Sequence, residues 1–244
     1  MNTVDKAEIE LFEAISQDWW DPNGPLKPLH KLNPERIRYI RQQIESHFRL
    51  KQDMERPFEK LSILDIGCGG GLVCEAMSRL GGKVTGIDAA AKNINIAIEH
   101  AELSGLDIEY LPLSSEQLLG KGTQYDVVLA LEIIEHVSDI QSFVEHCTKL
   151  VKPGGLVIFS TLNRTPESFA LGIVAAEHLL RWVPKGTHSW QKFLKPSEIA
   201  RLLRTNGFKA KDVTGLCYQP FKDSFKLNKK DLKVNYFLSA TKQD

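Results

Sequence analysis

The chain has 244 residues, of which 42% are hydrophobic and 25% charged, a composition that suits one α/β domain with a sizeable core. Its 31 basic and 31 acidic residues give a formal net charge of zero, so no overall basic field favours nucleic acid as a partner. The four cysteines form no CxxC pair and no Cys/His ligand spacing, which argues against a disulfide framework or a zinc site. No stretch reaches the roughly 18 apolar residues that span a bilayer, and the first ten residues are not typical of a signal peptide. We therefore expect a cytoplasmic protein.

The first part of the chain, residues 1–60, is polar and rich in predicted helix. It carries an aromatic pair, Trp19-Trp20, followed by a turn-rich stretch from Asp21 to His30. The segment Asn33-Pro34-Glu35 predicts a helix start, because proline is favoured in the first turn of a helix. We expect these residues to form a helical cap on the domain that follows.

From residue 61 onward, apolar strands alternate with helices. Strands are predicted at 61–66, 83–87, 108–112, 125–131, 156–161, 208–218 and 233–241, and helices at 72–80, 91–104, 139–150 and 197–206. The helix at 139–150 is expected to close at the turn residues 152–155, and Gly207 stands where a helix C-cap belongs. This order predicts an α/β fold with a mostly parallel, seven-stranded sheet and helices on both faces. Within one domain we distinguish the N-terminal cap (1–60), the core (61–162), an insertion or lid (163–195) and the last part of the sheet (196–244).

A glycine-rich turn follows the first predicted strand. Asp65-Ile-Gly67-Cys-Gly69-Gly-Gly71 connects that strand to a helix, so its backbone can approach a ligand closely and present N–H groups to it. Asp88 ends the second strand, 21 positions after Gly67, where a carboxylate can accept ribose hydroxyls. A dinucleotide fingerprint would need glycine or alanine at position 72, which is leucine. Asp65 would repel a pyrophosphate but suits an ammonium group, and the pattern D-x-G-x-G-x-G resembles motif I of class I S-adenosylmethionine-dependent methyltransferases.

Two carboxylates and an imidazole follow the fourth predicted strand within five residues: Glu132, Glu135 and His136, here called the acidic cluster. If this segment turns helical, the three side chains share one face. They could then hold a divalent cation such as Mg²⁺ or deprotonate a substrate hydroxyl. A solvated loop with one helix-capping acid is the alternative.

At this point the chain resembles a known family, the ubiquinone biosynthesis O-methyltransferases of bacteria and mitochondria. The resemblance runs from about residue 9 to 242 and is carried by the segments WWDPNGPLKPLHKLNPERIRYI, LDIGCGGG, LEIIEHV, LVKPGG, FSTLNRT, VPKGTH and KFLKP. LDIGCGGG and LVKPGG occur in many methyltransferases, whereas the Trp-Trp-Asp and Pro-Lys-Gly-Thr-His blocks are more specific. The resemblance implies a Rossmann-like class I methyltransferase fold.

The resemblance also implies roles for individual residues. It places S-adenosylmethionine against Arg36, Gly67, Asp88 and Leu131, and the acidic cluster at positions that hold a divalent metal in mitochondrial members. With the residues of the glycine-rich turn, the predicted cofactor-binding set is Arg36, Asp65, Gly67, Gly69, Asp88 and Leu131. The implied substrates are phenolic hydroxyls of polyprenylated ubiquinone precursors, 2-polyprenyl-6-hydroxyphenol and 3-demethylubiquinol. A methyltransferase for another phenolic or catecholic molecule, and a non-catalytic scaffold within a biosynthetic complex, remain alternatives.

The predicted insertion reads SFALGIVAAEHLLRWV over residues 168–183, an apolar helix that is too short to span a bilayer. Its tryptophan and neighbouring cations suit a helix lying in the membrane interface, since the implied substrate carries a long isoprenoid tail. Lysines at 222, 226, 229, 230 and 233 could add attraction to anionic lipid. We therefore expect peripheral contact with the inner face of the membrane. A buried lid over the active site or a dimer contact is the alternative.

Overall fold

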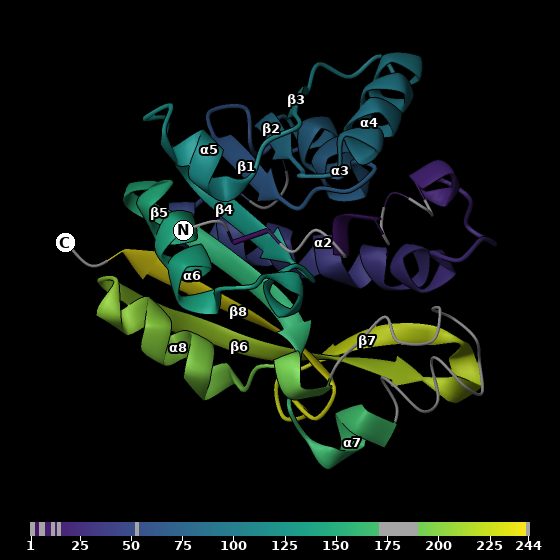
Figure 1. The fold of residues 1–244 in the computed structure, drawn as a ribbon, viewed down its shortest axis with the longest axis vertical. Helices are drawn as coiled ribbons and strands as arrows, with labels where there is room; N and C mark the ends of the chain where they lie inside the picture. Colours follow the sequence, from purple (N-terminus) through teal and green to yellow (C-terminus); the bar gives the residue numbers. More distant parts are fainter. Residues whose placement is uncertain are drawn as a thin grey trace.

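The fold is built on one eight-stranded sheet with helices on both faces (Figure 1). The computed structural model describes residues 3–4, 8–10, 13, 16–51, 54–170 and 190–242. In chain order the strands are β1 (Ser62–Ile66), β2 (Lys83–Ile87), β3 (Glu109–Leu111), β4 (Tyr125–Leu131), β5 (Val151–Leu162), β6 (Phe208–Gln219), β7 (Ser224–Asn228) and β8 (Asn235–Lys242). The helices of more than three residues are α2 (Lys27–Phe48), α3 (Leu72–Arg79), α4 (Ala91–Leu103), α5 (Ser115–Leu119), α6 (Ile140–Lys149) and α8 (Pro196–Thr205).

The strand order is β3-β2-β1-β4-β5-β8-β6-β7. The first five strands in this order pair in parallel, and the last three are joined by antiparallel pairing. Ile63 of β1 lies opposite both Val84 of β2 and Val127 of β4. The order reverses direction at β1, so the carboxyl ends of β1, β2 and β4 meet at the switch point where such sheets bind ligands.

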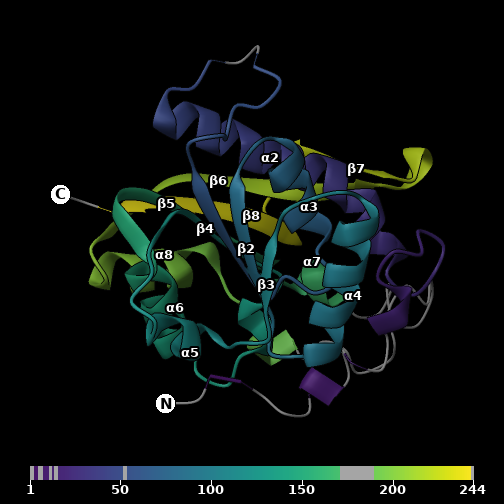
Figure 2. The ribbon, with the colours of Figure 1, turned by 90° about the horizontal axis from the view of Figure 1, so that it is seen from above.

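Each face of the sheet is covered by its own set of helices (Figure 2). Alternate residues of a strand point to opposite faces, so Ile63 packs under α2, α3 and α4, whereas Leu64 packs against α5, α6 and α8. Both residues are fully buried. Burial on both faces explains why these strands read as continuous apolar runs rather than as an alternation.

Helix α2 begins at Lys27, six residues before the helix start that the sequence predicts. A proline at its second position, Pro28, occupies the first turn, where a missing N–H costs nothing, and Pro34 lies inside the helix. The interior proline removes one hydrogen bond of the helix. The helix continues because its apolar side, which includes Tyr39 and Ile40, is buried against the sheet.

Two further differences from prediction concern the sheet. Strand β7 lies in the lysine-rich segment, where the sequence predicts no strand, so the sheet has eight strands rather than the predicted seven. Its pairing with β6, in register from Gly215 opposite Asn228, gives those half-exposed residues backbone partners. The predicted turn at 152–155 is part of β5, where it forms an irregularity in the pairing with β4. Gly207 does follow α8 with a φ of +77°, as its C-cap position predicts.

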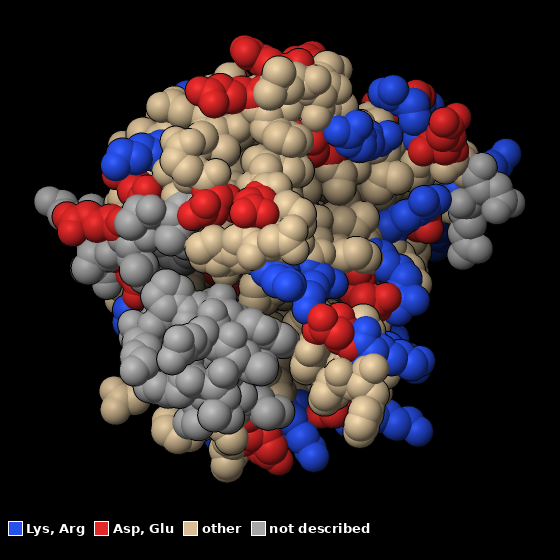
Figure 3. Space-filling model, turned by 90° about the vertical axis from the view of Figure 1, so that its right-hand side faces the viewer, with Lys and Arg blue, Asp and Glu red and all other residues tan. Residues whose placement is uncertain are grey.

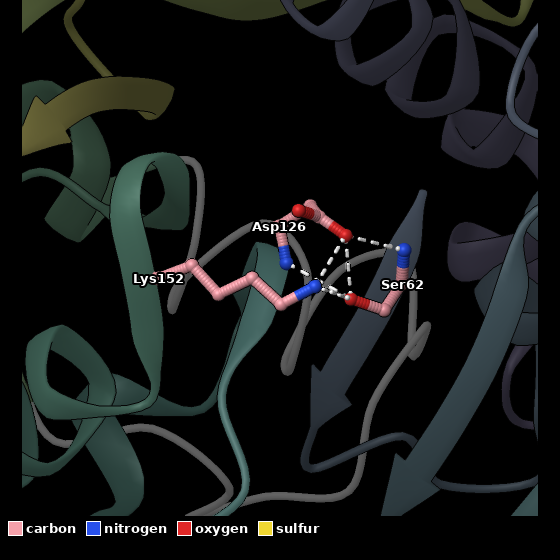
Figure 4. Close-up of polar contacts among 3 residues, drawn as sticks. All are labelled: Ser62, Asp126 and Lys152. Atoms are coloured by element: carbon pink, nitrogen blue, oxygen red, sulfur yellow. Dashed lines mark hydrogen bonds and ion pairs between the residues drawn. The ribbon is translucent and has the colours of Figure 1, made fainter. Parts of the chain in front are cut away.

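A polar cluster links three neighbouring strands near their amino-terminal ends, on the side away from the switch point (Figure 4). Asp126 of β4 accepts hydrogen bonds from the backbone N–H and hydroxyl of Ser62 in β1, at 2.8 and 2.6 Å. Lys152 of β5 contacts the same carboxylate oxygen at 2.9 Å and the Ser62 hydroxyl at 3.0 Å. Because the lysine neutralises the carboxylate and the serine is shared between them, we interpret this cluster as structural.

The predicted interfacial helix at 168–183 lies outside the described residues except for its first three positions. Its role as a membrane contact or lid therefore stays a prediction. Among the helices that the structure does describe, none is both long and apolar enough to cross a bilayer.

Candidate active site

A cavity of about 680 Å³ opens at the switch point of the sheet. Its floor contains the glycine-rich turn after β1, Asp88 after β2, and the residues that follow β4. All nine predicted site residues line it: Arg36, Asp65, Gly67, Gly69, Asp88, Leu131, Glu132, Glu135 and His136. Its volume lies within the range of about 300–1,000 Å³ that ligand pockets span. The predicted residues are therefore brought to one place by the fold.

The glycine-rich turn lets neighbouring side chains pack directly against its backbone, and three of its amide N–H groups already have hydrogen-bond acceptors within the fold. Gly67 and Gly69 have φ angles of +74° and +53°. A Cβ at Gly67 would lie 2.7 Å from Ile133, and one at Gly69 would lie 2.2 Å from the ring of Trp19, so neither position tolerates a side chain. The N–H groups of Gly67 and Cys68 donate to Ile87, and that of Gly69 donates to Asp88. These three amides therefore have acceptors within the fold, and the prediction that the turn presents N–H groups to a ligand stays a prediction.

Asp88 holds the end of β2 against the glycine-rich turn. Its two carboxylate oxygens accept hydrogen bonds from Gly69 N–H at 2.9 Å and from Ala90 N–H at 2.8 Å. Burial raises the pKa of Asp88, although both backbone donors oppose that rise. A carboxylate oxygen has a second lone pair, so Asp88 can keep these bonds and still accept from ligand hydroxyls.

Asp65 lies at the bottom of the cavity and is 3% exposed. Its hydrogen-bond donor is the thiol of Cys74, with 3.4 Å between Sγ and Oδ2. Burial raises the pKa of Asp65 to about 7, against the lowering effects of Cys74 and of the positive charge of Arg36. A buried carboxyl of this kind gains strongly from a cationic ligand group, because the cation stabilises its ionised form.

Arg36 and Glu132, which the sequence assigned to different roles, form an ion pair with each other. Glu132 also accepts a hydrogen bond from the Ser160 hydroxyl at 2.7 Å, and its backbone has a φ of +49°, which is uncommon outside glycine. Arg36 is buried, and its Nε has no hydrogen-bond partner among the described residues. A buried, unpaired donor of this kind at a cavity wall is suited to an anionic ligand group.

Glu135 and His136 lie in a short 3-10 helix, Ile134–His136, that follows Glu132. Glu135 is buried and accepts a hydrogen bond from the Thr161 hydroxyl at 2.9 Å, and its pKa is raised by burial. His136 Nδ1 lies 3.0 Å from a carboxylate oxygen of Glu8. Burial alone would lower the pKa of His136, but the hydrogen bond to Glu8 and the charge of Glu135 outweigh it and raise that pKa.

These contacts bear on the predicted metal site. Glu132 precedes the 3-10 helix, so the expected single helical face for the acidic cluster does not form. Its three members are held separately by Arg36, by Thr161 and by Glu8. Across the described ranges, no group of three or more His, Cys, Asp or Glu side chains is arranged to hold a metal ion. The cluster as it stands does not fit a shared ion, which would have to displace Arg36 and Glu8.

Leu131 completes the predicted cofactor-binding set, and two serines outside that set also line the cavity. Leu131 is buried at the end of β4 and offers an apolar contact to the cavity. Ser114 caps helix α5, where its hydroxyl accepts from Gln117 N–H, and both Ser114 and Ser115 line the cavity.

Residues near the N-terminus are the part of the site that sequence reasoning missed. Glu8 lies against His136 and also contacts Lys192 at 3.1 Å, while Thr3 donates to Glu116 through its N–H at 2.9 Å. A single glutamate in a polar segment gives no signal of such a role. Trp19, in contrast, belongs to the aromatic pair that stands out in the sequence. Its ring covers the glycine-rich turn, and its Nε1 donates to Asn93 at 3.0 Å.

Comparison with known proteins identifies the family. A family model described as a methyltransferase domain matches residues 35–213. A protein of Cereibacter sphaeroides named ubiquinone biosynthesis O-methyltransferase is 48% identical over 242 residues, which cover 99% of this chain and 98% of the relative. One of the same name from Bartonella bacilliformis is 49% identical, covering 97% and 95% of the two chains. The chain belongs to the ubiquinone biosynthesis O-methyltransferase family.

Solved structures support the fold of this family member. Magnesium protoporphyrin IX methyltransferase from Synechocystis, determined with bound SAH, superposes with a TM-score of 0.70 at 19% identity and covers 98% of this chain and all of its own. A SAM dependent methyltransferase from Aquifex aeolicus gives a TM-score of 0.56 at 16% identity, covering 85% and 97%. The predicted class I methyltransferase fold is thereby confirmed, as is the prediction of a S-adenosylmethionine-dependent O-methyltransferase.

Proposed function

We propose that this protein transfers a methyl group from S-adenosylmethionine to phenolic hydroxyls of polyprenylated ubiquinone precursors. The proposed acceptors are 2-polyprenyl-6-hydroxyphenol and 3-demethylubiquinol. One observation carries the proposal beyond family membership: a single cavity joins the glycine-rich turn to the acidic cluster. A donor held at the turn and a phenol held at the cluster would therefore meet within one cavity, as a bimolecular transfer requires.

The cofactor end of the cavity is assigned by the chemistry of each group. Asp88 would accept the ribose hydroxyls, and Asp65 would pair with the ammonium of the methionine part. The guanidinium of Arg36 would bind the methionine carboxylate through donors that Glu132 does not use. Gly67 and Gly69 leave room for Ile133 and Trp19, which lie where a Cβ would stand, so these two side chains would pack over the turn beside the bound cofactor. Leu131 would pack against the adenosine.

At the acceptor end, the acidic cluster would remove the proton of the phenol and orient its hydroxyl. A phenol with a pKa near 10 is mostly protonated at neutral pH, so its proton must leave before or during transfer. We assign His136 as the proton acceptor, with Glu8 and Glu135 stabilising the imidazolium that forms. The phenolate oxygen then bonds to the methyl carbon while the carbon–sulfur bond breaks, which leaves the thioether S-adenosylhomocysteine. Glu132, fixed by Arg36 and Ser160, would orient the acceptor hydroxyl.

The proposal is tested with purified protein, S-adenosylmethionine and a 2-prenyl-6-hydroxyphenol of short chain. We expect one methyl group on the phenolic oxygen, identified by mass and by comparison with a synthetic standard. His136→Ala should lose turnover while still binding S-adenosylmethionine. Methylation of unprenylated catechols alone would favour another phenolic substrate, and binding of no cofactor would favour the scaffold alternative. In cells, deletion should remove ubiquinone and accumulate an unmethylated hydroxyphenol.

We also propose that the protein works at the inner face of the membrane, as a peripheral partner of anionic lipid and within a ubiquinone biosynthesis complex. The support is chemical, because the proposed substrate is nearly insoluble in water. The five lysines at 222–233 are all exposed, although Lys229 pairs with Asp212 at 2.7 Å. The face shown in Figure 3 carries basic and acidic side chains interspersed, so any attraction would be local. Co-sedimentation with anionic but not neutral liposomes would support the proposal, and no co-sedimentation would contradict it.

A further inference from the structure

The cavity has a second, apolar end that the methyl transfer itself does not use. Leu29 and Leu32 of α2 form one wall of this end, and Leu216 and Phe225 of the β6–β7 hairpin form the other. All four belong to one apolar cluster. We call this end of the cavity the apolar arm.

The apolar arm is continuous with the charged part of the site. Leu29, Leu32 and Arg36 are spaced by three and four residues, so they lie on the same side of α2 and pass from apolar to cationic along the helix. The opposite wall contains two aromatic rings, Tyr218 and Phe225, whose centroids are 5.3 Å apart. A ligand with a polar ring and an apolar chain would match this sequence of surfaces.

Polar contacts outside the arm hold its two walls at a fixed separation. Lys31 of α2 forms an ion pair with Asp223 at the tip of the hairpin, and Asp223 also accepts from the Tyr218 hydroxyl at 2.7 Å. Farther along, Glu35 accepts a hydrogen bond from Leu227 N–H at 3.3 Å. Helix and hairpin are thus joined by their polar edges, while their apolar side chains face the cavity.

The outer end of the arm leads to an exposed aromatic side chain. Pro220 lines the cavity, and Phe221, the next residue, is fully exposed at the hairpin tip. Phe221 is therefore the exposed apolar side chain that directly follows the cavity lining at this tip.

We propose that the apolar arm binds the first isoprene units of the substrate's tail and leads the rest of the tail to the surface at Phe221. The inference rests on the proposed function, because it presumes a prenylated ring at the acidic cluster. It adds that the protein selects for the tail as well as for the ring. Each bound isoprene unit should then raise kcat/KM roughly tenfold until the arm is filled, since every buried methylene contributes to binding.

The test compares the full-length protein acting on the same hydroxyphenol with no tail and with one, two or three isoprene units. The measured quantity is the ratio of kcat/KM for tailed over tailless substrate. We expect Leu29→Trp, which fills the arm, to lower this ratio at least tenfold. Leu103→Ser is the matched control, because Leu103 is an exposed leucine on α4 that does not line the cavity, and it should keep the wild-type ratio.

Two outcomes would overturn the inference. The first is a wild-type ratio near one while the tailless ring is methylated, which leaves the proposed function intact. The second is a high ratio that Leu29→Trp does not change. A direct measurement separates binding from turnover: a three-isoprene alcohol should saturate wild-type protein, followed by intrinsic tryptophan fluorescence, and should bind Leu29→Trp at least tenfold more weakly. Absence of turnover on every ring would overturn the proposed function, and equal binding of the alcohol by both proteins would overturn the tail site.

Discussion

Cofactor binding should release a proton from Asp65. The carboxyl is buried, and burial raises its pKa to about 7, so at pH 7 roughly half of the ligand-free molecules carry a proton there. If the ammonium of S-adenosylmethionine pairs with Asp65, the ionised form is stabilised and the pKa falls. The free protein then holds more protons than the complex, so affinity must rise with pH through this range.

The expected magnitudes follow from the position of the pKa. Binding should release about half a proton at pH 7 and about nine-tenths of one at pH 6. Between pH 6 and pH 5 the affinity should fall roughly tenfold, because nearly every free molecule must lose a proton to bind. Titration calorimetry in two buffers of different ionisation enthalpy measures the proton count directly.

Asp65→Asn provides the matched control, since the amide oxygen can still accept from the Cys74 thiol. The variant should bind S-adenosylmethionine more weakly, and its proton release near pH 6 should disappear. Proton release that is unchanged in Asp65→Asn would assign the titration to another group. If the wild-type protein releases no proton at all between pH 6 and 7, the reasoning about Asp65 is wrong.

Four further predictions address other parts of the site and the fold. Asp88→Ala should weaken S-adenosylmethionine binding by about 1.5–3 kcal/mol in calorimetric titration, as for a lost charged hydrogen bond; unchanged affinity would remove Asp88 from the site. Glu8→Gln should lower kcat about tenfold with little effect on cofactor affinity, because His136 loses a charged partner. Glu10→Gln, which changes an exposed neighbour, should leave kcat unchanged. Equal losses in the two variants would show that the N-terminal segment as a whole matters, rather than the contact between Glu8 and His136. The resemblance implies a metal at the acidic cluster, but the contacts of that cluster do not fit a shared ion, so turnover should persist in a chelator; loss of turnover that Mg²⁺ restores would contradict this expectation. Lys152→Met should reduce the free energy of unfolding by only about 0.5–1 kcal/mol, since the ion pair is partly exposed, and a larger loss in chemical denaturation would show that the cluster in Figure 4 is more than a surface tie.

The core of the fold could be predicted because its sequence signals are local. The strand ending at Leu131 is an apolar run that is buried on both faces. Gly67 and Asp88 directly follow the carboxyl ends of two parallel strands, where sheets of this kind bind their ligands. Pairing of parallel strands then brings these ends together without further information. For that reason the sequence predicts which strand ends line the cavity, while the role of each residue toward the cofactor stays a prediction.

The contacts that could not be predicted join segments far apart in the chain. Glu8 reaches His136 across 128 positions, and Arg36 reaches Glu132 across 96. Nothing in the spacing of either pair reveals the other member. Strand β7 was missed for a different reason: its lysine and asparagine lower its apparent β propensity, and it forms because β6 offers it backbone partners at the edge of the sheet.

One end of the described chain lies at the cavity and the other lies away from it, and this difference decides where an affinity tag should be placed. Thr3 lines the cavity and its carbonyl accepts a hydrogen bond from Ser138 N–H at 3.0 Å, so Thr3 is part of the cavity wall. Strand β8 runs the other way and ends beside Leu156, near the opposite edge of the sheet. An affinity tag fused before residue 1 would therefore start close to a residue that lines the cavity, whereas the same tag placed after residue 244 would follow a strand that ends away from it.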